Sequence, residues 1–220
     1  MKKLIIISSL LWCFSNIIKA QDNIVVKERE EVRDSRNKLH IGLKIGLNNS
    51  NVYDSRGEDF NTTPKLGFVG GAFLSIPIGK YLGLHPEVLY SQKGFYSKGT
   101  FEGTTYNLSR TTSYMDVPVM LEFKPSRFIT ILGGPEYSYL LAQTDVFSKS
   151  SITAVQEQEF TNNNIRKNTL GAIFGVDLNL GHFVVGARYA FDMQTNNGDG
   201  SSTVPRYKNE WIQGTVGFRF

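Results

Sequence analysis

The side chains best suited to acid–base chemistry in this sequence are its three histidines, His40, His85 and His182. An imidazole acts as a general base near neutral pH, usually beside a residue that orients it. His40 and His85 fall inside stretches of alternating apolar and polar residues, and His182 falls in a short link between two such stretches. We therefore expect packing and turn roles for all three, and we predict no enzyme activity, no catalytic residue and no cofactor.

Thiol and metal chemistry are also unsupported. Cys13 is the only cysteine and lies in a segment typical of a secretory signal peptide, with Lys2 and Lys3 before an apolar run over residues 4–14. Cleavage after Ala20 would leave the mature chain without a thiol for a disulfide or a metal. No His or carboxylate pair shows ligand spacing on an identifiable element, so we predict no metal site.

The net charge excludes another class, the nucleic-acid-binding proteins. The chain has 24 Lys and Arg against 20 Asp and Glu. Lys2, Lys3 and Lys19 leave with the predicted signal peptide, so 21 basic residues face 20 acidic ones. No basic patch remains that would favour nucleic acid as a partner.

From residue 38 onward the dominant pattern is an alternation of apolar and polar residues. Leu39 to Leu47 are apolar at every second position, and Lys44 lies on the opposite face. Successive side chains of a strand point to opposite faces, so such a strand has one apolar face and one polar face. Eight runs show this pattern at about the length that a tilted strand needs to cross a bilayer: 39–47, 66–76, 82–91, 115–123, 129–139, 169–178, 183–192 and 212–220.

The links between these runs are alternately short and long. Short turns on the periplasmic side and long loops outside are typical of outer-membrane barrels. We predict an all-β, closed, antiparallel, eight-stranded transmembrane β-barrel with up-and-down topology, and local bulges at Pro86 and Pro135. The predicted short links are 77–80, 125–127 and 181–182, and the long ones are 48–64, 94–112, 142–167 and 194–209.

A soluble, lipocalin-like ligand-binding barrel is the alternative fold, because it shows the same alternation with the apolar face turned inward. Three features favour the membrane: charges of both signs share the minority face, aromatic residues gather at strand ends, and the chain ends in Phe220. The expected domain order is a signal peptide over 1–20, a periplasmic N-terminal arm over 21–37 and an outer-membrane β-barrel domain over 38–220.

Three short stretches also resemble a known family. HPEVLYSQKG over 85–94, MDVPVMLEF over 115–123 and GARYAF over 186–191 are similar to the porin-like outer-membrane barrels of the Bacteroidetes called the PorT family. The resemblance covers residues 38–220 and implies an eight-stranded barrel, but little about activity. One namesake member serves the gliding and secretion apparatus. The terminal Phe220 is similar to the signal that the outer-membrane assembly machinery reads.

The polar faces of the predicted strands carry charges of both signs. Inside a narrow barrel these charges must pair to offset their desolvation. An eight-stranded interior is just wide enough for side chains to fill, which favours a plug of salt bridges. The alternative is a narrow pore, for which five inward glycines leave room: Gly67, Gly71, Gly171, Gly175 and Gly217. The expected structural network comprises Lys44, Glu87, Asp116, Glu122, Glu136, Asp177, Arg188, Asp192 and Arg219.

These observations predict a structural, binding or passive-transport role. An alternative is assistance in secretion or surface adhesion through the long loops, because loops on a rigid scaffold often carry function. The link 142–167 either extends its hairpin above the membrane or forms a polar loop. Expected partners are outer-membrane lipid and lipopolysaccharide, the assembly machinery, and an unidentified surface or periplasmic protein.

Overall fold

The computed structural model describes residues 35–56, 61–101, 104–149, 152–157, 165–197 and 206–220. The predicted signal peptide and most of the predicted arm lie outside these ranges, apart from a single 3-10 turn at Ser35–Asn37. No helix within the described residues is long and apolar enough to cross a membrane.

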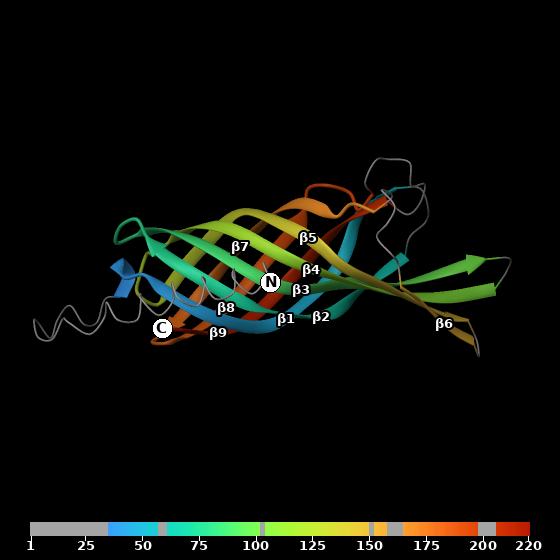
Figure 1. The fold of residues 1–220 in the computed structure, drawn as a ribbon, viewed down its shortest axis with the longest axis horizontal. Helices are drawn as coiled ribbons and strands as arrows, with labels where there is room; N and C mark the ends of the chain where they lie inside the picture. Colours follow the sequence, from blue (N-terminus) through green and yellow to red (C-terminus); the bar gives the residue numbers. More distant parts are fainter. Residues whose placement is uncertain (1–34, 57–60, 102–103, 150–151, 158–164, 198–205) are drawn as a thin grey trace, which may run out of the picture. The chain divides into compact units, whose positions relative to one another are not determined.

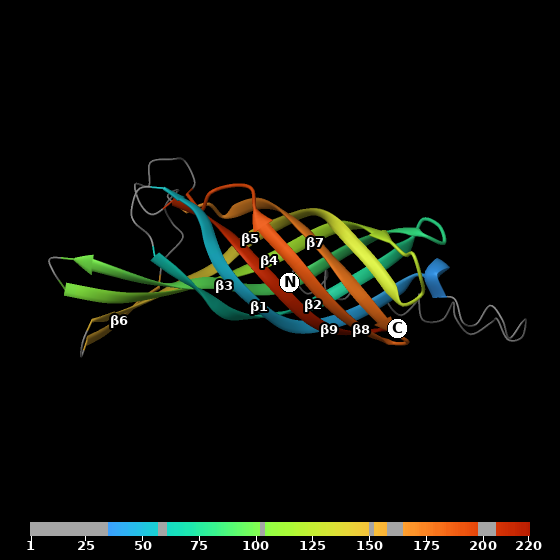
Figure 2. The same ribbon diagram turned by 180° about the vertical axis from the view of Figure 1, so that it is seen from behind.

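The body from residue 36 onward is built almost entirely of antiparallel strands (Figure 1). They pair in the order β4-β3-β2-β1-β9-β8-β7-β5, and β5 pairs back with β4. The eight-stranded closed antiparallel barrel predicted from the sequence is therefore confirmed. Figure 2 shows the wall formed by β7, β8 and β9. The strands are β1 (His40–Arg56), β2 (Asn61–Pro77), β3 (Leu82–Phe101), β4 (Thr104–Phe123), β5 (Ile129–Lys149), β6 (Ile152–Glu157), β7 (Asn168–Leu180), β8 (Phe183–Asp192) and β9 (Arg206–Arg219).

The alternation decides which side chains face outward. On β1, Leu43 and Ile45 are 59% and 63% exposed, whereas Lys44 between them is 5% exposed. The other strands repeat this arrangement, with a continuous band of apolar side chains on the outside of the barrel. The lipocalin-like alternative is wrong, because it requires the apolar face to point inward. An apolar outer band around a polar interior is the arrangement that lipid demands of a spanning barrel.

The short turns lie at one end of the barrel, called here the short-turn end. β2–β3, β4–β5 and β7–β8 are joined there, the last by Gly181 and His182. Gly181 has φ of 67°, a left-handed conformation that a glycine adopts without steric cost. The predicted short links are confirmed.

Much of the predicted long links is strand rather than loop. β3 runs on to Phe101 and pairs with β4 from Thr104, and β5 runs on to Lys149 and pairs with β6. Figure 1 shows these strands continuing past the closed part of the barrel. Within the described residues, the link 142–167 thus extends its hairpin. We call these segments the sheet extension: 61–65 of β2, 92–101 of β3, 104–113 of β4, 142–149 of β5, and β6.

The predicted bulges at Pro86 and Pro135 are wrong. Pro86 lies opposite Val119 and Pro135 opposite Ala172, and the register is the same on both sides of each proline. A proline lacks one N–H donor, so it removes a ladder bond without forcing an extra residue into the strand. Two register shifts instead occur near the start of the sheet extension, between Pro64 and Val69 and between Ser113 and Tyr114, and a third occurs near the end of β1, between Tyr53 and Arg56.

Candidate functional site

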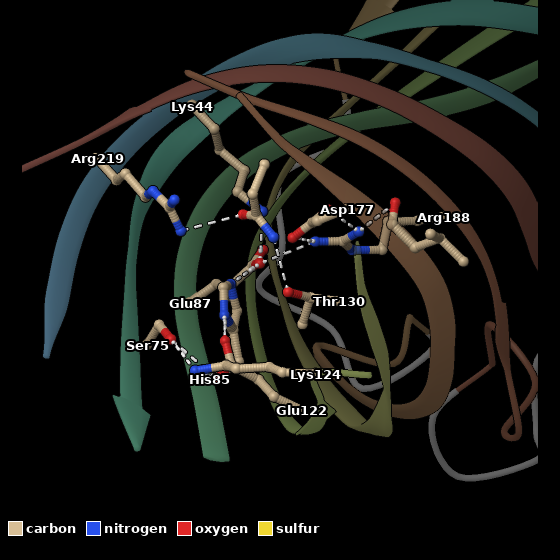
Figure 3. A network of polar contacts seen from close by, with 12 residues as sticks. Lys44, Ser75, His85, Glu87, Glu122, Lys124, Thr130, Asp177, Arg188 and Arg219 are labelled. Atoms are coloured by element: carbon tan, nitrogen blue, oxygen red, sulfur yellow. Dashed lines mark hydrogen bonds and ion pairs between the residues drawn. The ribbon is translucent and has the colours of Figure 1, made fainter. Parts of the chain in front are cut away.

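Near the short-turn end, the barrel interior holds a continuous chain of charged side chains (Figure 3). Lys44 Nζ of β1 lies 2.5 Å from Glu87 Oε1 of β3. His85 links two carboxylates, with Nε2 2.8 Å from Glu87 and Nδ1 2.6 Å from Glu122 of β4. Lys124 Nζ lies 2.6 Å from the other oxygen of Glu122. His85 thus bridges two buried carboxylates, one on its own strand and one on β4.

Arg188 of β8 joins this chain from the opposite wall. Its guanidinium makes two hydrogen bonds with Asp177 of β7, at 2.5 and 3.0 Å, and lies 3.6 Å from Glu87. Two parallel hydrogen bonds between a guanidinium and a carboxylate hold both groups in one orientation, in addition to the attraction between their charges. Arg219 differs from the other predicted network residues, because it is only half-buried and donates to the Asn179 amide oxygen at 3.2 Å.

A second charged group is centred on Lys93 of β3, which is 1% exposed. Lys93 Nζ lies 3.0 Å from Asp116 and 3.3 Å from Glu136, both of them predicted network residues. The same ammonium lies 3.5 Å from the centroid of the Trp211 ring, a cation–π contact in a desolvated site. Asp192 lies beside this group and accepts a hydrogen bond of 2.6 Å from the Asn209 amide.

Apolar side chains fill further interior space. A side chain at Gly175 would overlap Arg188, and one at Gly42 would overlap the Phe73 ring, so these inward glycines accommodate large neighbours rather than a channel. The apolar cluster draws on five strands, and none of its members is more than 2% exposed: Met120, Leu132, Ile173, Ala190 and Trp211.

A third group lies inside the sheet extension. Arg110 makes a bidentate pair with Asp145, with both distances 2.7 Å, and donates to the Tyr207 hydroxyl at 3.1 Å. Burial lowers the pKa of Arg110, but the Tyr207 oxygen and the Asp145 carboxylate oppose it and raise the pKa overall. The pair sits beside a buried cluster of Val52, Phe95, Leu108 and Tyr207.

The structure therefore buries eight of the nine predicted network residues, all but Arg219. Sequence reasoning missed Lys93, Arg110 and Asp145, because each lies just past the point where the apolar alternation ends. Continuing the polar face of the run 82–91 by one step would have reached Lys93. His85 belongs to the network, whereas His40 and His182 contact backbone oxygens at the short-turn end. In the described part of the chain, no three His, Cys, Asp or Glu residues are placed to hold a metal ion.

Comparison with known proteins agrees with this architecture. A family model described as "outer membrane protein beta-barrel domain" matches residues 20–192. The chain belongs to this outer membrane β-barrel family. Membership of this family, together with the apolar outer band, places the protein in the bacterial outer membrane.

Solved structures of small outer-membrane barrels are similar to this chain at low sequence identity. Ail, the attachment invasion locus protein of Yersinia pestis, solved with the heparin analogue sucrose octasulfate, has a TM-score of 0.50 and 15% identity, covering 83% of this chain and 99% of Ail. Neisserial surface protein A has a TM-score of 0.42 and 12% identity, and the match covers 83% of this chain and 97% of that protein. OprG of Pseudomonas aeruginosa has a TM-score of 0.39 and 12% identity, and the match covers 82% of this chain and 95% of OprG. No curated protein matches the sequence.

Proposed function

We propose that this outer-membrane protein is a sealed scaffold that presents a β-sheet for binding outside the cell, with no catalytic role. The observation that carries the proposal is the filled interior, where paired charges and the apolar cluster of Trp211 occupy the same eight-stranded cross-section. An eight-stranded barrel has room for side chains but little more. The sheet extension supports the binding role, because it projects a polar surface past the apolar band.

The proposed orientation puts the short turns in the periplasm and the sheet extension outside. Short periplasmic turns and longer external segments are the rule for bacterial barrels. The resemblance of residues 85–94, 115–123 and 186–191 to the PorT family supports an origin in the Bacteroidetes. Export through a signal peptide cleaved after Ala20, and delivery by the assembly machinery through Phe220, belong to the same proposal. The sheet extension also provides the surface for the alternative roles in adhesion or secretion.

Planar-bilayer recordings test the seal. At high protein loading we expect no discrete conductance steps, because the interior is filled by charged pairs and apolar side chains. Insertion is checked separately by vesicle flotation and by comparing mobility in SDS with and without boiling, since a closed barrel resists SDS when cold. Reproducible single-channel steps from inserted protein would contradict the seal and favour the narrow pore.

A further inference from the structure

The outward face of the sheet extension carries a groove of about 560 Å³, called here the outer groove. Four strands contribute to it through three successive rungs of the ladder. One outward-facing rung runs through Asn61, Lys98, Asn107 and Ser148, which lie opposite one another in β2, β3, β4 and β5. The rung two residues along, also outward-facing, contains Tyr96 and Ser109, and the Ser97–Leu108 rung between them has buried side chains. The groove is therefore built by regular pairing across the sheet.

The lining of the outer groove suits a sugar. Amides and hydroxyls donate and accept hydrogen bonds, and a Tyr ring offers an apolar surface beside a polar tip. Asn61, Asn107 and Ser109 supply the first kind of group and Tyr96 the second. Tyr96 is 47% exposed, so its ring is available on the outer surface.

Two lysines give the groove a positive charge. Lys98 is exposed on one rung, and Lys65 Nζ lies 2.8 Å from the Ser109 hydroxyl, 2.6 Å from the Thr111 hydroxyl and 5.2 Å from the Tyr96 ring centroid. No carboxylate of the described residues forms an ion pair with either lysine. Burial lowers the pKa of Lys65, while the Asp145 carboxylate across the sheet opposes this shift. An anion in the groove would stabilise both ammonium groups.

The height of the groove identifies where such an anionic sugar would come from. Tyr90 and Met115 form the last apolar rung of β3 and β4. Tyr96 lies six residues further on, about 20 Å along the strand at the usual rise per residue. With a strand tilt of roughly 40°, this places the groove about 15 Å above the apolar band. That level lies above the hydrocarbon, among the sugars carried by lipids of the outer leaflet.

We propose that the outer groove binds the negatively charged core sugars of lipopolysaccharide. The inference rests on the proposed orientation and names the ligand class of the proposed binding surface. Acyl chains of the same molecule lie against the apolar band below, so the sugars are presented to the groove at high effective concentration. Lys65 and Lys98 pair with phosphate or carboxylate groups of the core, and Tyr96 packs against a sugar ring.

The test measures binding of two purified lipids to the full refolded chain in detergent micelles by isothermal titration. One is lipopolysaccharide with a complete core, and the other is lipid A from which all core sugars have been removed. We expect the wild type to bind the complete form at least 10-fold more tightly. The double variant Lys65→Gln/Lys98→Gln is expected to lose this preference. The matched control is Lys208→Gln, which removes a charge from β9 at the same end of the barrel, outside the groove.

Three results would overturn the proposal: equal affinity of the wild type for both lipids, an unchanged preference in the double variant, or an equal loss in the Lys208→Gln control. Soluble core oligosaccharide, freed from its lipid, is expected to compete weakly with the complete form. If it binds as tightly as the intact lipid, the occupant is a free glycan and the membrane source is wrong. Cold and boiled mobility in SDS shows that each variant is folded. If the groove does not bind the core sugars, the sealed-scaffold proposal is unaffected, because the conductance measurement tests it separately.

Discussion

At the scale of single residues, the interior charges act in groups rather than as isolated pairs. Lys93 is shared by Asp116 and Glu136, and His85 is shared by Glu87 and Glu122. Buried ion pairs add little net stability compared with apolar packing, but loss of one partner is costly because the other charge stays buried. Lys93 therefore ties β3 to β4 and β5, the next two strands of the same wall, and His85 ties β3 to β4.

Replacing Lys93 with Met tests this role. The change leaves Asp116 and Glu136 side by side without their cation, and we expect it to lower the free energy of unfolding by about 3–5 kcal/mol. Unfolding in urea from lipid vesicles is followed by the fluorescence of Trp211, whose ring lies 3.5 Å from the Lys93 ammonium. The same replacement at exposed Lys98 is the control and should leave the midpoint unchanged. A stability loss at Lys98 equal to that at Lys93 would show that the buried cluster is not the cause.

Residue types also show what sequence alone can decide. The alternation correctly predicts that Lys44 and Asp177 face inward, because every second side chain of a strand shares a face. It does not predict which charges meet, since Lys93 of β3 pairs with Asp116 of β4 and Glu136 of β5, and these pairings depend on how the three strands align. Contacts across the barrel depend on register and tilt, and neither is specified by the pattern within one strand.

At the scale of elements, β7 gives the clearest view of the lipid-facing surface. Its outward side chains run from Leu170 to Leu180, with Val176 near the middle and Leu180 at the short-turn end. We expect Val176→Arg to destabilise the barrel by about 2–4 kcal/mol in vesicles, because a charge at the midplane is far from water. Leu180→Arg on the same strand should cost only about 0–1 kcal/mol. Equal costs at the two positions, measured by urea unfolding, would contradict the proposed depth of β7.

Strand ends are where prediction from sequence was weakest. Apolar alternation marks only the part of a strand that meets lipid, so it stopped at residue 91 in β3 and started at 115 in β4. Backbone pairing continues to the Phe101–Thr104 pair, because hydrogen bonds between strands do not require apolar side chains. The outer groove and the Arg110–Asp145 pair both lie in this part, so apolar alternation predicts neither of them.

At the scale of the whole molecule, the barrel inverts the usual distribution of side chains. Its interior buries seven carboxylates against five Lys and Arg in the described residues, with His85 between two of the carboxylates. Closure of β4 on β5 satisfies the backbone of every spanning strand, as a bilayer requires. Because successive strands are antiparallel, their connections alternate between the two ends, with the short turns at one end and the sheet extension at the other.

Because the ends differ, orientation in the membrane is directly testable with single cysteines in a chain carrying Cys13→Ser. Lys208→Cys lies on β9 near the extended end, and Arg127→Cys lies in the exposed turn between β4 and β5. We expect a large, membrane-impermeant maleimide to label Lys208→Cys on intact cells, and Arg127→Cys only after the outer membrane is permeabilised. The reverse pattern would place the sheet extension in the periplasm. It would remove the groove from lipopolysaccharide altogether, because those sugars occupy the outer leaflet, while leaving the sealed interior unaffected.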